Sequence, residues 1–145
     1  MDITSLNINL FAFLLSGVGA FLLGLVWYHP KVMGAQLAEA TGLNPEELTK
    51  KPMSFIISFF LWILSACFYA FICGFFEVSA VEDTQLAAAG YFALSSLLWV
   101  AFAMPPALMG GLYTGRSFDA VAIDASYQLA GYYVFAGVHI AFLFI

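Results

Sequence analysis

The residues best able to do chemistry in this sequence form a short polar run inside an apolar C-terminal segment. Asp124 is followed about one helical turn later by Tyr127 and Gln128, so the three side chains share one face of a helix. An acid whose polar neighbours continue into a membrane bundle is a candidate functional site. The alternative is that Asp124 only begins a helix, since the first turn favours a carboxylate. Both interpretations stay open at the level of the sequence.

Four more polar residues are expected at the same height as Asp124. His29 follows the first apolar segment, Tyr113 and Arg116 end the third, and Asp119 precedes the fourth. A short loop makes the last two segments antiparallel neighbours, so we predict an ion pair between Arg116 and Asp124, closed over by His29 and Tyr113. In the alternative reading, Tyr113 belongs to an aromatic belt, Arg116 marks the cytoplasmic side and Asp119 is a helix N-cap.

Metal, haem and nucleophilic chemistry are not expected. His29 and His139 lie near opposite ends of membrane-crossing segments, and no Cys–His cluster or Ser/His/Asp set shares one height. Cys67 and Cys73 point apart on one helix and are interpreted as packing residues. We therefore predict no metal, no cofactor and no enzymatic activity. The four Lys and Arg residues are also too few for nucleic-acid binding.

Four long uncharged segments must position these residues. Hydrophobic residues make up 63% of the chain and charged residues 9%, whereas soluble domains carry about 25% charged residues. Each segment reaches the ~20 residues that a helix needs to cross the bilayer. We predict an all-α membrane protein, one transmembrane domain over residues 1–145 that forms a four-transmembrane-helix bundle in the lipid bilayer. The expected spans are approximately 8–28, 53–76, 86–113 and 120–145.

The basic residues set the expected orientation. Lys31, Lys50 and Lys51 follow the first span and Arg116 follows the third, whereas the N-terminus and the loop after the second span have none. Positively charged loops stay in the cytoplasm. Both termini are therefore predicted to be periplasmic.

In the first cytoplasmic loop, the spacing of apolar residues predicts a short amphipathic helix over Lys31–Thr41 that lies on the membrane surface. Gly42 is expected to end it. A second short helix is expected to begin at Asn44, followed by Pro45 and an acidic first turn.

Small residues at helical spacing predict close helix contacts. The first span carries Ser16, Ala20 and Gly24, and the second carries a similar row from Ser54 to Gly74. Helices associate in lipid through such residues because their backbones can approach closely. One stripe must pack within the chain, and the other is expected to serve a homo-oligomer.

Two adjacent prolines interrupt the third span. Pro105 and Pro106 lack amide protons, so the carbonyls of Ala101 and Phe102 lose their helical donors and the helix should kink. The kink is interpreted either as a packing feature or as a gate that contacts a cation.

Several short motifs lie at the ends of the predicted spans: Trp27-Tyr28-His29-Pro30-Lys31 with Met33-Gly34, the two prolines, Tyr113 to Arg116, and Ile123 to Tyr127. Together they resemble a bacterial family of small four-helix membrane proteins catalogued as a domain of unknown function. The resemblance implies the bacterial inner membrane and no known activity, and it supplies no catalytic residues. Where the family commonly has Trp, this chain has Gln36 and Leu37.

Three classes of function follow from these features. A structural or accessory subunit, in a homo-oligomer or a larger membrane complex, is the leading interpretation. A small transporter or channel would use the proline-kinked third span and the Asp124 face. A membrane-embedded enzyme is the weakest, because no acid–base pair shares a site.

Overall fold

The computed structural model describes residues 9–44 and 52–145, and every regular element in these ranges is helical. The predicted all-α fold is therefore confirmed. η2 and η4 are π-helical segments and η3 is a 3₁₀ turn. In chain order the elements are α1 (Leu10–Trp27), η2 (Pro30–Gly34), α2 (Ala35–Thr41), α4 (Pro52–Phe75), η3 (Val78–Ala80), α5 (Thr84–Leu98), η4 (Trp99–Ala103), α6 (Met104–Thr114) and α7 (Phe118–Ala141).

Three of the long helices begin at an N-cap residue whose side chain accepts a hydrogen bond from a backbone amide in the first turn. Asn9 begins α1, Asp83 begins α5, and Ser117 begins α7 by accepting from the amide of Ala120. The prediction that Asp119 is the N-cap of the last span was wrong. Ser117 takes that role, and Asp119 lies in the first turn, where the helix dipole also favours a carboxylate.

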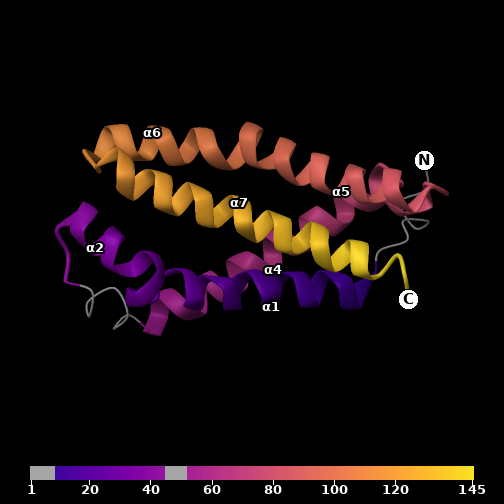
Figure 1. Ribbon diagram of the computed structural model, residues 1–145, viewed down its shortest axis with the longest axis horizontal. Helices are drawn as coiled ribbons and strands as arrows, with labels where there is room; N and C mark the ends of the chain where they lie inside the picture. The colour runs from indigo at the N-terminus through magenta and orange to yellow at the C-terminus, as the bar shows by residue number, and fades with distance from the viewer. Residues whose placement is uncertain (1–8, 45–51) are drawn as a thin grey trace.

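The helix α7 lies at the centre of the structure (Figure 1). It packs against α1 on one side and against α5 and α6 on the other, while α4 packs chiefly along α1. The buried core gathers around Tyr69 of α4 and Phe135 of α7, with Ala20 of α1 and Tyr91 of α5 against them. α7 is therefore the helix around which the other long helices are arranged.

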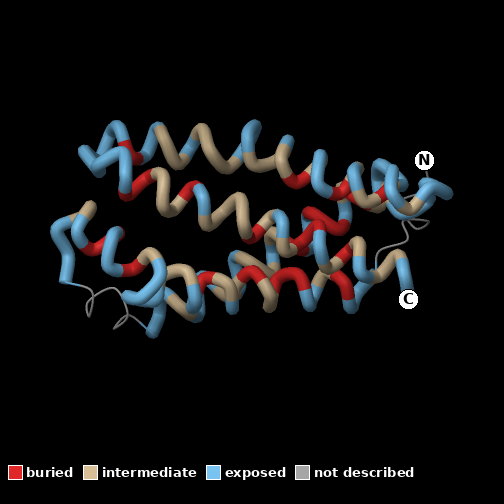
Figure 2. The backbone as a smooth tube through the Cα atoms, in the orientation of Figure 1, coloured by how far each residue is buried: buried red, intermediate tan, exposed pale blue. Residues whose placement is uncertain are grey.

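Three helical runs are long and apolar enough to cross a membrane, namely 10–27, 52–75 and 84–114. Large side chains such as Phe60 and Leu97 are 64% and 62% exposed on these runs, and Figure 2 shows exposed positions along the helices. Such surfaces are compatible with a protein surrounded by lipid. The fourth predicted span, 120–145, corresponds to α7, which ends at Ala141 and falls outside this group. Its crossing of the bilayer stays a prediction.

The two prolines follow a π-helical segment. The run from Thr84 to Thr114 stays helical throughout, but residues 99–103 form a π-helix and Pro105 and Pro106 occupy the first turn of α6. Because the residues before them are helical too, the missing amide protons of these prolines leave carbonyls of the preceding turn without their helical donors. The helix changes to π-helical winding at this place, and the predicted kink itself stays a prediction.

The connection between α1 and α4 is partly helical, as predicted. α2 ends at Gly42, which has φ +66°. Leu37 and Ala38 are buried, and α2 packs on α7, where the Ser117 hydroxyl donates to the Ala40 carbonyl at 2.8 Å. The apolar side of α2 therefore packs on the protein, and its place on the membrane surface stays a prediction. The predicted second short helix beyond Asn44 lies outside the described residues.

The small-residue stripe of α1 is used within the chain. Ser16, Ala20 and Gly24 are all buried between α4 and α7. On α4, Ala66 and Ala70 are buried too, whereas the start of that row is exposed. The α1 stripe is consequently not available to a second copy.

Candidate functional site

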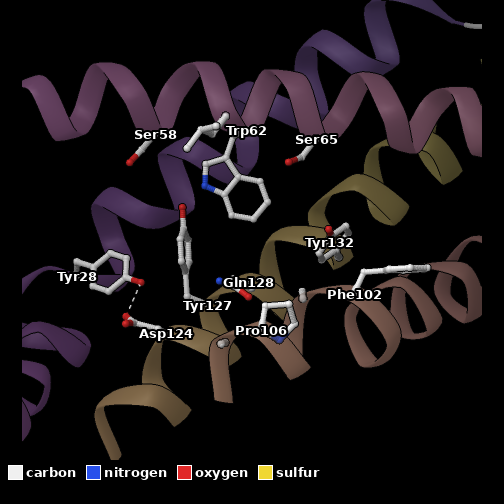
Figure 3. Close-up of a pocket in the computed structure, with 13 residues that line it drawn as sticks. Tyr28, Ser58, Trp62, Ser65, Phe102, Pro106, Asp124, Tyr127, Gln128 and Tyr132 are labelled. Atoms are coloured by element: carbon white, nitrogen blue, oxygen red, sulfur yellow. Dashed lines mark hydrogen bonds between the residues drawn. The ribbon is translucent and has the colours of Figure 1, made fainter. Parts of the chain in front are cut away.

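A cavity of about 650 Å³ opens between α4 and α6, with α7 as its floor (Figure 3). It exists because α4 packs on α1 and α6 packs on α7, while α4 and α6 are not a main packing pair among the described elements. We call it the α4–α6 groove. Its lining is Tyr28, Ser58, Leu61, Trp62, Ser65, Phe102, Ala103, Pro106, Ala107, Asp124, Tyr127, Gln128 and Tyr132.

Asp124 lies at the end of the groove nearest the start of α7, and its carboxylate accepts hydrogen bonds from two different parts of the chain. The Tyr28 hydroxyl donates to Oδ1 at 2.9 Å, and the Arg116 guanidinium donates to Oδ2. The predicted Arg116–Asp124 ion pair is therefore confirmed. The two side chains are 40% and 25% exposed, so water still reaches the pair.

Tyr28 joins α1 to this pair. It is the C-cap of α1 and lies beyond the last residue of that helix. Burial, and then the charge of Asp124 and the hydrogen bond to it, raise the pKa of the Tyr28 phenol. Its hydroxyl consequently stays protonated at neutral pH and acts as the donor.

Two residues predicted to close over the pair do not do so. His29 is exposed, and its Nδ1 accepts from the amide of Lys31 at 3.2 Å. Tyr113 is 92% exposed. Gly111 is the residue of α6 that faces α7, and two residues farther along, Tyr113 points about 200° away from it. The cover predicted from His29 and Tyr113 was therefore wrong.

Asp119 is also separate from the groove. It is exposed and, with Glu39 and Gln36 of α2, lines a different surface depression.

Tyr127 stands at the junction of α1, α4 and α7. Its hydroxyl donates to the carbonyl of Ala20 at 3.1 Å, and its ring meets those of Tyr28 and Trp62 edge-on at centroid distances of 5.0 and 5.4 Å. A Cβ at Gly24 would collide with the Tyr127 hydroxyl. The small stripe of α1 thus lets this tyrosine reach across the bundle.

Gln128 contributes a buried polar atom to the groove. Its Oε1 is inaccessible to solvent, and no donor among the described residues reaches it. A buried acceptor without a donor costs about 1–3 kcal/mol. Gln128 lines the groove, and because its Oε1 is closed to solvent, a bound ligand would reach this atom only after the side chain turns toward the groove.

Sequence reasoning missed the contribution of α4. Ser58, Trp62 and Ser65 face the groove (Figure 3). Ser58 and Trp62 belong to the small-residue row, which was interpreted as a packing stripe. The signal that could have identified them is the presence of the hydroxyl groups of Ser58 and Ser65 on an otherwise apolar helix that carries no charged residue.

The opposite end of the molecule holds a second buried polar cluster. His139 of α7 lies between the rings of Tyr69 and Tyr91, and its Nδ1 is 2.9 Å from the Phe135 carbonyl and 3.4 Å from the Ser16 hydroxyl. It is thus far from His29, which follows the other end of α1. No three His, Cys, Asp or Glu side chains gather as a metal site in the described part of the chain.

A family model described as "Protein of unknown function (DUF1761)" matches residues 11–140. No curated protein and no solved structure matches the chain. The matched segment contains the whole lining of the groove and the Arg116–Asp124 pair. The predicted resemblance to a domain of unknown function is thereby confirmed, and the chain belongs to the DUF1761 family.

Proposed function

We propose that the chain is a four-span protein of the bacterial inner membrane that binds a small molecule in the α4–α6 groove and moves it across the bilayer. The observation that carries this proposal is a cavity of about 650 Å³ with a carboxylate and an unpartnered amide oxygen between apolar helices. Polar groups inside a membrane are expensive and usually serve a substrate or ion.

The depth of the groove supports a role in transfer. Its lining runs along α7 from Asp124 to Tyr132, which is about 12 Å at 1.5 Å per residue. A molecule bound there would leave the cytoplasmic surface and reach the interior of the bundle. A surface docking site would not need that depth.

The π-helical segment supplies a candidate moving part. Phe102 in η4 and Pro106 in α6 both line the groove. π-Helical turns and prolines leave backbone carbonyls without regular partners, and such segments often mark hinges. Rewinding this segment would change the width of the groove.

The topology follows from the basic residues and helix lengths. α7 has 24 residues, about 36 Å of helix, which is enough to cross the bilayer. With Lys31 and Arg116 in the cytoplasm, both termini are periplasmic.

Solute flux into liposomes tests the proposal. The purified protein is reconstituted, and uptake of cationic, anionic and neutral solutes is compared for wild type and Asp124→Asn. We expect uptake of one class, lowered about tenfold or more by this variant. Asp119→Asn is the matched control, because it removes a carboxylate of the same helix outside the groove. Flux equal to that of empty liposomes for every class would reject transport.

An oligomeric structural or accessory subunit is the second candidate, and the open side between α4 and α6 favours it. A helix of a second copy, or of a larger complex, would fill this side and cover Leu61 and Phe102, which are 55% and 70% exposed. A cysteine at Ser58, in a chain without Cys67 and Cys73, would then cross-link between copies in native membranes. Monomers under all cross-linking conditions would exclude a symmetric homo-oligomer through this side.

A further inference from the structure

We propose that the ligand of the α4–α6 groove is an amphipathic amine, with its ammonium group beside Asp124 and Gln128 and its apolar chain between α4 and α5. This inference rests on the proposed binding role of the groove and specifies the chemical class of its ligand.

The charge of the lining selects against anions. Asp124 is the one charged side chain among the described lining residues, and Arg116, which pairs with it, is not part of the lining. Although the ion pair as a whole is neutral and partly solvated, the charge that faces the groove is therefore the carboxylate, which repels an anion. A cation placed there is attracted instead.

The hydrogen-bonding capacity of the site fits an ammonium group. Asp124 accepts one bond at each oxygen, from Tyr28 and from Arg116, and each carboxylate oxygen has room for a second donor. Gln128 Oε1 has no donor among the described residues. An ammonium group has three donors and no acceptor, so it can bind the carboxylate and, once the Gln128 side chain turns toward the groove, its Oε1 as well.

Aromatic rings complete the head-group site. Trp62 and Tyr127 meet at a centroid distance of 5.4 Å, and Tyr132 of α7 and Phe102 of η4 line the groove beyond them (Figure 3). The faces of such rings attract cations, and the attraction grows as water is excluded. Leu61 and Ala107 add apolar walls.

A second cavity provides a place for an apolar chain. It has a volume of about 400 Å³ and shares Ser65, Phe102 and Tyr132 with the groove, so the two are adjacent. Leu64, Phe68 and Ile72 of α4 line it. Because these α4 residues follow Ser58 along the helix, this cavity lies farther from the cytoplasmic end than Asp124 does.

Two sources can supply this chemistry. One is a free hydrophobic amine, and the other is an aminophospholipid that enters from the bilayer through the open side between α4 and α6. The two sources differ in how they would interact with Arg116. Arg116 competes with a free amine for Asp124, whereas it would bind the phosphate of a lipid.

The test compares ligands that share one tail and differ in charge. The full-length protein in detergent is titrated with 4-phenylbutylamine, 4-phenylbutanol and 4-phenylbutyrate, and dissociation constants are measured by calorimetry. We expect the amine to bind about tenfold or more tightly than either analogue, since it alone is attracted by the carboxylate and the rings. Equal or tighter binding of the acid or the alcohol would overturn the inference while leaving the groove a binding site. If none of the three binds and no lipid is retained, the inference and the proposed function both fail.

Two variants locate the amine. Asp124→Asn should weaken its binding about tenfold or more, whereas Asp119→Asn should leave it unchanged, because Asp119 lies outside the groove. Gln128→Leu removes a buried acceptor without a donor, so the protein should stay folded and lose affinity for the amine alone. Unchanged amine binding in both Asp124→Asn and Gln128→Leu would overturn the site.

A lipid arm separates the two sources. The protein is extracted from vesicles of equal phosphatidylethanolamine and phosphatidylglycerol, and retained lipid is counted by native mass spectrometry. Preferential retention of phosphatidylethanolamine that falls in Arg116→Ala would assign the site to a lipid amine. Tighter binding of 4-phenylbutylamine in Arg116→Ala, without lipid retention, would assign it to a free amine. Preferential retention of phosphatidylglycerol would contradict the amine class.

Discussion

The Asp124 carboxylate accepts hydrogen bonds from two different parts of the chain. The interaction with Arg116 should be measurable as a coupling between the stability effects of substitutions at the two residues. Tyr28 comes from the end of α1 and Arg116 from the loop before α7. We predict that Arg116→Ala and Asp124→Ala together cost less stability than the sum of the two single variants, by about 1 kcal/mol, because the pair is partly solvated. Thermal unfolding in detergent measures this coupling. Strictly additive losses would show that the contact adds no stability.

His139 illustrates a buried polar side chain held mainly by packing. Its ring lies against Tyr69 and Tyr91, and its Nε2 has no partner among the described residues. We predict that His139→Phe keeps most of the stability, whereas His139→Ala loses about 2–4 kcal/mol by opening a cavity. Unfolding of the two variants in detergent provides the comparison. If Phe were as damaging as Ala, the Nδ1 contacts to Phe135 and Ser16 would be the dominant contribution.

At the level of elements, the helices were largely predictable and their mutual contacts were not. The long uncharged segments placed the helices to within a few residues. Local signals could not rank Ser117 above Asp119 as the N-cap, because both residue types cap helices well. The exposure of Tyr113 depends on the rotation of α6 against α7, which is set by Gly111 meeting Val121. Such rotations are tertiary information.

The candidate site was half predictable for the same reason. Asp124 and Arg116 are close along the chain, so connectivity alone brought them together. Trp62 comes from α4, whose backbone packs chiefly along α1 and which meets α7 through large side chains such as Trp62 and Tyr69. No spacing within a single segment indicates such a neighbour.

Gly131 and Gly137 on α7 provide a matched test of helix approach. A Cβ at Gly131 would overlap the indole of Trp62, whereas no described atom lies within 4 Å of a Cβ at Gly137. We predict that Gly131→Ala destabilises the protein by about 1–3 kcal/mol through overpacking. Gly137→Ala should be neutral or stabilising by up to about 1 kcal/mol, because alanine favours the helix. Equal effects on thermal unfolding would mean that α4 and α7 are not in this contact.

For the molecule as a whole, the arrangement of α7 explains why it is less apolar than its neighbours. Because α7 packs against α1, α2, α5 and α6, polar residues on it can face other helices or the groove without being exposed to lipid. Gln128, Tyr127 and His139 are accommodated in this way. A helix surrounded by other helices can cross a membrane with a composition that a lipid-facing helix could not tolerate.

The crossing of α7 is the central prediction for the whole molecule. Single cysteines are placed at Val81, Gly115 and Phe144 in a chain whose Cys67 and Cys73 are replaced, and intact cells are treated with a membrane-impermeant maleimide. We expect labelling at Val81 and Phe144 from outside and protection at Gly115, because Arg116 and Lys31 hold their loops in the cytoplasm. Gly115 should become reactive once the membrane is permeabilised, which controls for local burial. All three positions are exposed in the chain, so protection reports the membrane. Labelling of Gly115 and Phe144 from the same side would show that α7 does not cross, and the groove would then open at a different depth from the one assigned here.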